Sequence, residues 1–208
     1  MLCLVTGASR GIGRAIAESF LADGARVAVC ASTAAPDLRG AALSVRCDVA
    51  DEEQVRRFFE QAGKPDCVVI NAGVLERGPI EEFTAAQWDR VLGVNLRGAF
   101  LCAREGFRRG AQRIIALGSI SGTLGTAHSA AYNASKWGLT GLIKSLAEEG
   151  RERRIFCAAV LPGSVDTAML KKTPYQPEMK CEDVARVVKF LCTEAPFAMT
   201  GSAVEVFG

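Results

Sequence analysis

Short apolar runs alternate along this chain with longer segments of helical periodicity, and no other feature constrains the possible fold as much. Most of the runs are nearly continuous in Val, Ile, Leu, Ala and Cys, as strands covered on both faces must be. Seven of them are expected to be strands: Leu2–Val5, Arg26–Ala31, Leu43–Cys47, Cys67–Ile70, Ile114–Leu117, Ile155–Leu161 and Ala203–Phe207. Strands that alternate with helices predict a parallel sheet joined by right-handed crossovers.

Five segments between these runs are expected to be helices: Gly13–Ala22, Glu52–Gln61, Ala85–Phe107, Ala131–Glu149 and Glu182–Cys192. In the last of them apolar side chains recur at i, i+3, i+4 and i+7, which gives the helix one apolar face. No linker or internal repeat divides the 208 residues. The sequence therefore predicts one domain, residues 1–208, with a doubly wound α/β fold and helices on both faces of the sheet.

The second crossover is expected to be unusually short. Residues 32–42 separate the second and third predicted strands, and Pro36 and Gly40 interrupt any helix there. A parallel crossover usually needs about a dozen or more residues, typically including a helix. We expect this crossover to be reduced to a loop or a single turn.

Composition excludes several classes of function. Lys and Arg number 25 against 23 Asp and Glu, and a net charge of +2 gives no electrostatic footprint for nucleic-acid binding. No apolar run approaches the roughly 20 residues that span a bilayer. The eight cysteines are scattered without CxxC pairs and His128 is the only histidine, so we expect buried free thiols and no metal site. The first predicted strand begins almost at Met1, which leaves no room for a signal peptide and makes a reducing cytoplasm the expected location.

A glycine-rich loop lies between the first predicted strand and the first predicted helix. It reads Thr-Gly-Ala-Ser-Arg-Gly-Ile-Gly over residues 6–13. Gly7 permits a tight turn, Gly11 lets the backbone approach a pyrophosphate, and Gly13 allows the helix to pack closely on the strand. The helix N-terminus then offers free N–H groups to the anion. Because of its position the loop predicts dinucleotide binding, and without a following Gly-Lys-Ser/Thr it is not a Walker A loop.

Together with four further segments in the same order, this loop resembles the short-chain dehydrogenase/reductase family, whose cofactor loop reads Thr-Gly-x-x-x-Gly-x-Gly. The four segments are Asp48-Val49, Asn71-Ala72-Gly73, Ser119 with Tyr132 and Lys136, and Pro162-Gly163 with Val165 and Thr167. The resemblance covers essentially the whole chain and is strongest to bacterial 3-oxoacyl-carrier-protein reductases. It implies a single NAD(P)-binding, Rossmann-like domain of about seven strands, and an oxidoreductase.

Tyr132 and Lys136 are four residues apart in a predicted helix, so both side chains project from one face. Taken alone, this is a commonplace spacing. In the resemblance Tyr132 is the general acid for carbonyl reduction and the base for alcohol oxidation, while Lys136 lowers the tyrosine pKa and holds the nicotinamide ribose. The ammonium, with the positive ring of an oxidised nicotinamide, is expected to bring that pKa from about 10 towards the working range.

Ser119 lies thirteen residues before Tyr132, at the carboxyl end of the predicted strand Ile114–Leu117. Open α/β sheets bind their ligands at this edge. A hydroxyl there is placed to hydrogen-bond the substrate carbonyl oxygen and to stabilise charge that develops on it. Ser121 is the alternative two residues further on, and the family pattern selects Ser119.

Asn95 completes the catalytic tetrad that the resemblance implies. It lies within the predicted helix Ala85–Phe107, where asparagine is unfavourable by propensity. Its side chain and a loosened helix carbonyl would hold a water that relays protons to Lys136. The alternative is a buried asparagine with a purely structural role.

The end of the second predicted strand favours NADP(H) over NAD(H). No acidic residue stands there to bind the adenosine ribose and repel a 2′-phosphate, the nearest acid downstream being Asp37. Arg10, with Ser32 or Thr33, is expected to bind the 2′-phosphate. The alternative is that Arg10 is merely a solvated loop cation.

The remaining cofactor contacts follow from the resemblance. Asp48 would hydrogen-bond the adenine amino group with Val49 beside the ring, and Val165 and Thr167 would contact the nicotinamide carboxamide. The residues expected to bind the cofactor are Gly7, Ser9, Arg10, Gly11, Ile12, Gly13, Ser32, Thr33, Asp48, Val49, Asn71, Ala72, Gly73, Tyr132, Lys136, Pro162, Gly163, Val165 and Thr167.

The substrate lid is also expected to be short. Fourteen residues, 168–181, separate Thr167 from the helix that begins near Glu182, where members of the family usually have a longer, partly helical lid. We expect an open cleft suited to a long, tethered or bulky carbonyl substrate, or a permissive one. Four residues are expected to line it, the histidine without a catalytic role: Thr123, Leu124, His128 and Met169.

Five arginines are expected around the active-site entrance and subunit interface, where a basic rim would dock an acidic acyl carrier protein: Arg108, Arg109, Arg113, Arg153 and Arg154. Ordinary pairing with helix dipoles is the alternative. The resemblance further implies a homotetramer or homodimer that packs the two long helices predicted over Ala85–Phe107 and Ala131–Glu149.

These observations predict an NADPH-dependent reductase of a ketone or 3-oxoacyl carbonyl, with Tyr132 as general acid. The expected partner is a small-molecule or carrier-bound carbonyl substrate, with neither nucleic acid nor a membrane involved. Two alternatives stay open: an NAD(P)-dependent alcohol or polyol dehydrogenase working in the oxidative direction, and a nicotinamide-binding regulatory protein without turnover.

Overall fold

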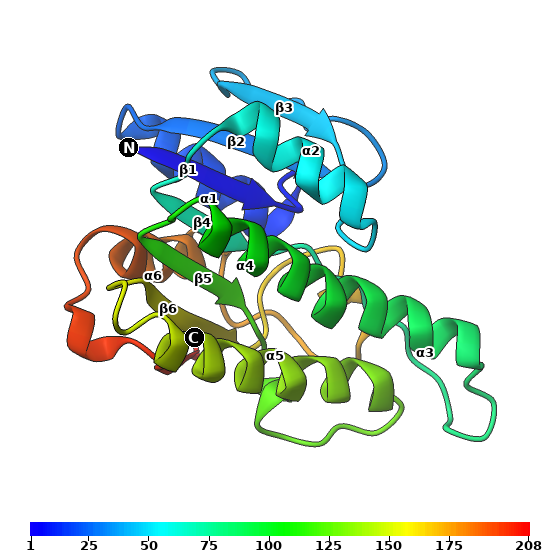
Figure 1. Ribbon diagram of the computed structural model, residues 1–208. Coiled ribbons are helices and arrows are strands. Elements are labelled where there is room, and N and C mark those ends of the chain that lie inside the picture. Colours follow the sequence, from blue (N-terminus) through cyan, green and yellow to red (C-terminus); the bar gives the residue numbers. More distant parts are fainter.

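All seven predicted strands form, within one residue of their expected ends, in the computed structural model, which describes residues 1–208. They are β1 (Leu2–Thr6), β2 (Arg26–Ala31), β3 (Leu43–Arg46), β4 (Cys67–Ile70), β5 (Arg113–Leu117), β6 (Phe156–Pro162) and β7 (Ala203–Val206). They make one sheet in the order β3-β2-β1-β4-β5-β6-β7, and every neighbouring pair is parallel (Figure 1).

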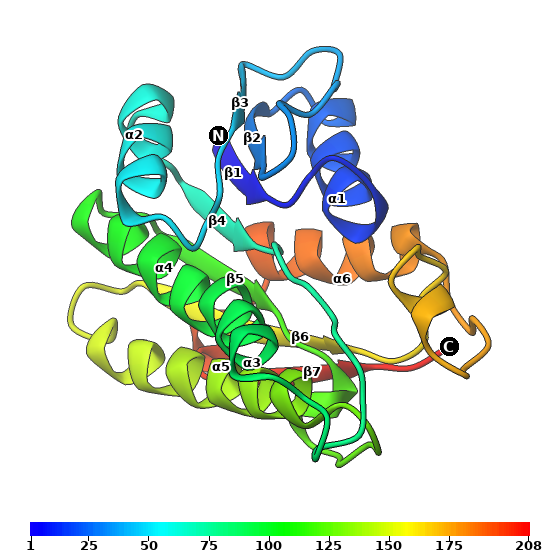
Figure 2. The same ribbon diagram turned by 90° about the vertical axis from the view of Figure 1, so that its right-hand side faces the viewer.

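The helices cover both faces of this sheet. They are α1 (Gly11–Ala22), α2 (Glu52–Ala62), α3 (Ala85–Leu92), α4 (Gly98–Arg108), α5 (Ala130–Glu149) and α6 (Cys181–Thr193). α1 and α6 lie on one face, and α2, α4 and α5 lie on the other (Figure 2). Each face has its own core of 25 buried residues, so the central strands are buried on both sides, as their continuous apolar runs predict. The doubly wound, Rossmann-like fold is confirmed.

The short second crossover contains no helix, as predicted. The chain between β2 and β3 is irregular, and only Pro36 and Leu38 in it are buried. Leu38 packs into the same core as Phe20 of α1, which holds the loop against that helix.

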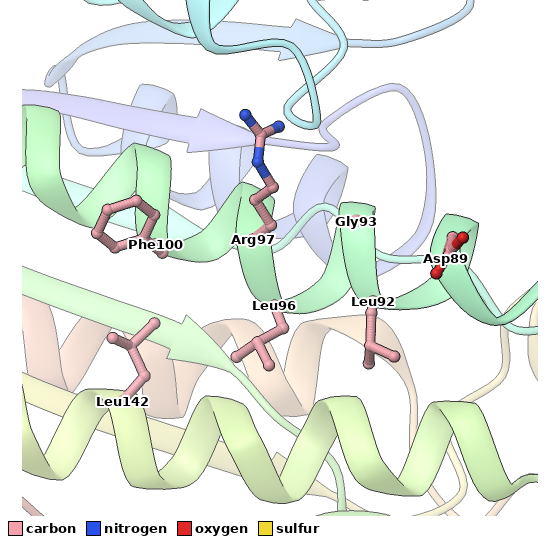
Figure 3. A pocket seen from close by; sticks show the side chains of 7 residues that line it. All are labelled: Asp89, Leu92, Gly93, Leu96, Arg97, Phe100 and Leu142. Atoms are coloured by element: carbon pink, nitrogen blue, oxygen red, sulfur yellow. The ribbon is translucent and has the colours of Figure 1, made fainter.

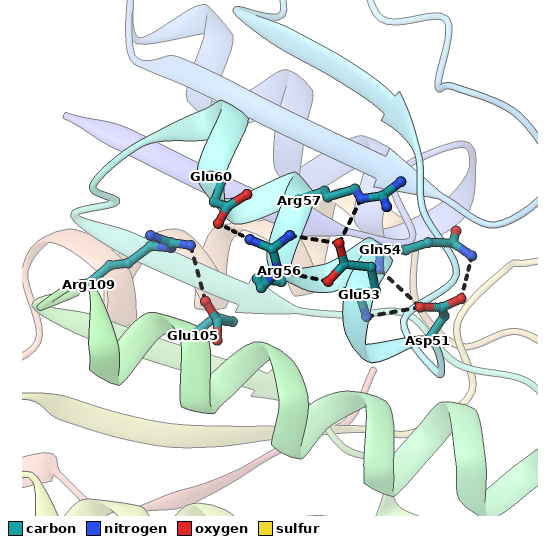
Figure 4. Close-up of polar contacts among 8 residues, drawn as sticks. All are labelled: Asp51, Glu53, Gln54, Arg56, Arg57, Glu60, Glu105 and Arg109. Atoms are coloured by element: carbon teal, nitrogen blue, oxygen red, sulfur yellow. Dashed lines mark hydrogen bonds and ion pairs between the residues drawn. The ribbon is translucent and has the colours of Figure 1, made fainter.

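The start of α2 is fixed by a side-chain cap. The Asp51 carboxylate accepts hydrogen bonds from the backbone N–H groups of Glu53 and Gln54 at 2.9 and 3.0 Å. Glu53 pairs with Arg56 and Arg57 (Figure 4), and these arginines lower its pKa to about 2. Because these side chains are about half exposed, the ion pairs contribute little to stability.

The helix predicted over Ala85–Phe107 is interrupted. A π-helical turn, Gly93–Arg97, separates α3 from α4 and contains Asn95. Such turns are rare and often occur at functional sites. The sequence predicts a loosened helix at this asparagine, and the structure has one.

The five arginines predicted at the active-site entrance lie at the opposite edge of the sheet, so that prediction is wrong. Helices in this fold run antiparallel to the strands, so their C-termini lie at the amino edge. Arg113 is the first residue of β5, whereas Ser119 follows its last residue. The Arg113 guanidinium donates to the Ala195 carbonyl oxygen at 2.9 and 3.0 Å, and Arg109 pairs with the buried Glu105 (Figure 4). These arginines bond to groups at or near the C-terminal ends of helices and do not form a docking rim at the active site.

All eight cysteines are free thiols, and seven of them are buried, as predicted; Cys181 is half-buried. None of the helices combines the length and the apolar character that crossing a bilayer requires.

Candidate active site

The glycine loop has a shape that larger side chains would destroy. Gly7 and Gly11 have φ angles of 68° and 59°, a region that disfavours residues with a Cβ. A Cβ on Gly7 would lie 2.8 Å from Ala72 Cα, and a Cβ on Gly13 would lie 2.5 Å from the Gly7 carbonyl oxygen. α1 begins at Gly11, and Arg10 at its N-cap makes no capping hydrogen bond with its side chain. The first N–H groups of α1 therefore have no side-chain cap that would compete with a phosphate, and the cradle fits a dinucleotide.

Thr6 and Asn71 hold this loop against the end of β4. The Thr6 hydroxyl accepts the backbone N–H groups of Asn71 and Ala72 at 3.0 and 3.1 Å. The Asn71 amide donates to the carbonyl oxygens of Thr6 and Gly7 at 2.9 and 3.0 Å. The Asn71 side chain, predicted as a cofactor contact, is thus committed to positioning the loop.

The end of β2 carries the exposed polar groups expected there, together with one cation that the prediction omits. Arg10, Ser32 and Thr33 are all exposed. Arg46 lies opposite Ala31 in the β2–β3 register, and its Nε donates to the Ser32 carbonyl oxygen at 2.9 Å. Pairing of the short β3 with the end of β2 is the signal that could have revealed Arg46.

Asp48 and Val49 follow β3, at the adenine side of the predicted site. The Asp48 carboxylate accepts from the Ala50 N–H at 3.0 Å, which shapes the turn. Val49 is only 5% exposed and packs under Gly98 of α4. Its side chain is therefore mainly part of the core, beneath the predicted adenine site.

Ser119, Tyr132 and Lys136 converge at the carboxyl edge. The Lys136 ammonium donates to the Leu117 carbonyl oxygen, at the end of β5, at 2.7 Å. It lies 5.6 Å from the centroid of the Tyr132 ring, so both side chains occupy one face of α5. The Ser119 hydroxyl lies beside the Tyr132 phenol and lowers its pKa, and it accepts the Ser121 N–H at 3.1 Å. Of the two candidate serines, Ser119 is the one that engages the tyrosine.

Burial dominates the electrostatics of this cluster. It raises the pKa of Tyr132 above its usual value, against the smaller lowering effect of the Ser119 hydrogen bond. It lowers the pKa of Lys136 to about 8. The lowering of this pKa expected from the ammonium together with an oxidised nicotinamide stays a prediction for the cofactor complex; in the protein alone burial is the largest effect. At neutral pH the phenol is therefore protonated and the lysine is mostly charged.

Asn95 is buried and all its hydrogen-bonding groups have protein partners. Its Oδ1 accepts the Val74 N–H at 2.8 Å, and its Nδ2 donates to the Val74 carbonyl oxygen at 2.9 Å and to Ser135 Oγ at 3.0 Å. Ser135, which the sequence interpretation missed, donates in turn to the Tyr132 carbonyl oxygen at 2.7 Å. The Asn95 side chain therefore has the contacts of a structural asparagine that connects the loop after β4 to α5. A Cβ on Gly73 would touch both Asn95 Oδ1 and Lys136 Nζ.

A cavity of about 190 Å³ opens beside Tyr132. Leu124 and Met169 line it as predicted, whereas His128 is exposed on a loop and Thr123 lies outside the lining. The cofactor positions predicted from the resemblance that line it are Ile12, Tyr132, Pro162, Gly163, Val165 and Thr167. The lid is short, with one 3₁₀ turn at Leu170–Lys172, and Val165 pairs with Met179 across its base. Arg77 also lines the cavity, and sequence analysis did not single it out.

A phosphate cradle after the first strand and an acid–base cluster at the same edge of a parallel sheet are what a nicotinamide-dependent oxidoreductase requires. The family model described as short chain dehydrogenase matches residues 2–178. The chain belongs to this family.

The similarity extends over the whole chain. It is 34% identical to a (3R)-3-hydroxyacyl-CoA dehydrogenase of Mus musculus over 245 aligned residues, covering 100% of this chain and 95% of the relative. Because that alignment is longer than the 208 residues of this chain, the relative carries insertions that this chain lacks. Shorter connections, like those seen after β2 and in the lid, are consistent with this difference.

Two solved structures show the same fold with nicotinamide cofactors. The 3-ketoacyl-(acyl-carrier-protein) reductase from Brucella melitensis complexed with NADH has a TM-score of 0.91 at 28% identity, covering 99% of this chain and 96% of that one. A short chain dehydrogenase from Burkholderia cenocepacia in complex with NADP has a TM-score of 0.88 at 31% identity, with the same coverage. This chain is accordingly an enzyme that uses a nicotinamide cofactor.

Proposed function

We propose that this enzyme, as one NAD(P)-binding domain over residues 1–208, reduces a ketone to an alcohol with NADPH. The convergence of Tyr132, Lys136 and Ser119 at the carboxyl edge of the sheet carries the proposal, because it places a phenol beside an ammonium where an acid can donate a proton to a carbonyl oxygen. The names of relatives support a 3-oxoacyl or similar carbonyl as the substrate class.

Each group has a defined task in this reaction. A bound nicotinamide supplies the hydride. The Ser119 hydroxyl donates a hydrogen bond to the substrate carbonyl oxygen, and the Tyr132 O–H donates the proton to that oxygen as negative charge develops. Lys136 holds the ribose hydroxyls and keeps a positive charge beside the phenol. Asn95 and Ser135 fix the first turn of α5 and so the position of Tyr132.

The test is consumption of NADPH by the purified protein with a panel of ketones, beside the reverse assay with alcohols and NADP⁺. Turnover of ketones at neutral pH is expected. Faster oxidation under all conditions would favour the dehydrogenase alternative, and cofactor binding without turnover on any substrate would favour a regulatory protein.

Cofactor preference is proposed to depend on Arg10 and Arg46. Arg10→Ala and Arg46→Ala should each weaken NADPH binding by about 10–100-fold, because each removes a charge-assisted bond of about 1.5–3 kcal/mol to the 2′-phosphate. NADH affinity should change by less than about threefold. Fluorescence titration of both cofactors measures this, with Arg39→Ala, which removes an exposed arginine of the β2–β3 crossover, as the matched control. Equal losses for NADPH and NADH would contradict the assignment.

The rate of reduction should depend on pH through Lys136. Its pKa of about 8 means that the ammonium loses its proton as pH rises through that value, while Tyr132, with a raised pKa, stays protonated. kcat/KM for ketone reduction is therefore expected to be level near neutrality and to fall above about pH 8, since this ratio reports the free enzyme. In Lys136→Arg the alkaline fall should shift upward by about two pH units or more, because guanidinium stays charged. An unshifted profile in that variant would remove Lys136 as the titrating group.

The proposed assembly is a homo-oligomer formed through α3, α4 and α5. A groove between these helices is lined by Leu92, Leu96, Phe100 and Leu142 (Figure 3), and Phe100 is 42% exposed. Apolar side chains gathered on an exposed face support burial against a second copy. The eight free thiols support a reducing compartment, the cytoplasm, as its location.

A further inference from the structure

Arg77 is the only charged residue that lines the active-site cavity. It lies in the loop between β4 and α3, and its guanidinium bonds to segments on both sides of the cavity. Nε donates to Ser129 Oγ at 3.3 Å, and the two terminal nitrogens donate to the carbonyl oxygens of Ala127 and Lys172 at 3.2 and 3.4 Å. Ser129 precedes α5 and stands three residues before Tyr132, so the guanidinium lies near the turn that carries the phenol.

No carboxylate of the chain neutralises this cation. The adjacent Glu76 pairs with Arg90 at 3.2 Å, and Arg77 takes part in none of the ion pairs of the protein. Its present partners are three neutral oxygens at long hydrogen-bond distances. Much of the surrounding cavity is apolar, including Leu75 and Leu170. A half-buried guanidinium in such surroundings binds a carboxylate much more strongly than neutral oxygens, and in a fork geometry.

The size of the cavity limits what can carry that carboxylate. Its volume of about 190 Å³ lies below the ~300–1,000 Å³ usual for ligand pockets, and it also includes residues of the nicotinamide side. A substrate held at both Tyr132 and Arg77 within this volume is therefore short, in contrast to the long, tethered or bulky substrate expected from the short lid. Longer substituents have room only at the rim, beside the exposed Leu124 and Tyr175.

We infer that Arg77 binds the carboxylate of the substrate, which makes the substrate class a short oxo acid. This inference rests on the proposed carbonyl reduction. In the reaction hydride adds to the carbonyl carbon and the Tyr132 proton adds to its oxygen, which yields a hydroxy acid. The carboxylate is unchanged and serves only to orient the carbonyl, so Arg77 is a specificity-determining residue.

The experiment compares short 2-, 3- and 4-oxo acids with their neutral methyl esters, such as acetoacetate with methyl acetoacetate, in the holoenzyme with NADPH. The wild type should prefer the acid of the best pair by about tenfold or more in kcat/KM. Arg77→Met should lower kcat/KM for the acid by about 10–100-fold, mostly through KM, and leave the ester within about threefold. Arg77→Lys should recover part of the loss, because it keeps the charge without the fork.

If Arg77 only connects the segment Ala127–Ser129 to Lys172 of the lid, a different outcome is expected. Arg77→Met would then lower the rates for acid and ester by the same factor, which would overturn the inference, as would a wild type that prefers esters. A binding measurement gives a second readout. With NADP⁺ present, the matching hydroxy acid should raise the Tm of the wild type but not that of Arg77→Met. Turnover of neutral ketones without acid preference defeats only this inference, whereas no turnover on any ketone defeats the proposed function.

Discussion

Tyr132→Phe is expected to lower kcat for ketone reduction by about 10³–10⁴-fold while changing NADPH affinity by less than about threefold. General acid catalysis contributes ~10²–10⁴ to a rate, and here one hydroxyl supplies the proton to the developing alkoxide. Phenylalanine keeps the ring that lies beside Lys136 and removes only the oxygen that meets Ser119. The measurement is steady-state turnover beside a cofactor titration, so that loss of chemistry is separated from loss of binding.

Tyr175→Phe is the matched control, because Tyr175 is the only other tyrosine in the chain and lines the same cavity. It is 50% exposed at the rim, and its loss of a hydroxyl should leave kcat within about twofold of the wild type. Equal activity of Tyr132→Phe and the wild type would remove Tyr132 from the mechanism. Equal losses of kcat in both variants would show that removal of any hydroxyl from the cavity lowers the rate, so that Tyr132 has no special role.

The strands and their parallel order could be predicted because burial on both faces leaves a direct mark on sequence. A strand such as β6 must be apolar at every position, which no amphipathic helix or half-exposed strand requires. The short crossover could also be predicted from sequence, because Pro36 and Gly40 interrupt a helix through local backbone constraints. The strands and the short crossover could be predicted because they depend on residues adjacent in sequence or on burial on both faces.

The features that escaped prediction depend on contacts between distant segments. Arg46 reaches the end of β2 only through the β2–β3 register, and Arg77 enters the cavity because its loop meets the segments around Ala127 and Lys172. In the protein alone burial is the largest influence on the tyrosine pKa, and burial is a property of the folded site that spacing along the chain does not give. The basic rim was misplaced although the predicted parallel sheet with crossover helices already puts the C-terminal end of each helix at the amino edge.

Gly13→Ala is expected to weaken NADPH binding by at least about 100-fold and to lower the Tm by about 2–12 °C. Its Cβ would lie 2.5 Å from the Gly7 carbonyl oxygen and would also collide with the Asn71 amide, so the loop or the start of α1 must move. Overpacking of this kind costs about 1–3 kcal/mol, and a shift of ~2–4 °C accompanies each kcal/mol in a domain of this size. Displaced N–H groups at the helix start lose charge-assisted bonds worth about 1.5–3 kcal/mol each, which accounts for the affinity.

Gly141→Ala separates this effect from helix propensity. Gly141 lies within α5, where a Cβ would meet nothing within 4 Å, so alanine should leave NADPH affinity unchanged and raise the Tm by a few degrees, since it is favoured over glycine by about 1 kcal/mol. If Gly13→Ala bound NADPH as tightly as Gly141→Ala, the loop after β1 would not be where the phosphates lie. The reason is that a cradle built from backbone N–H groups cannot shift and still hold the anion equally well.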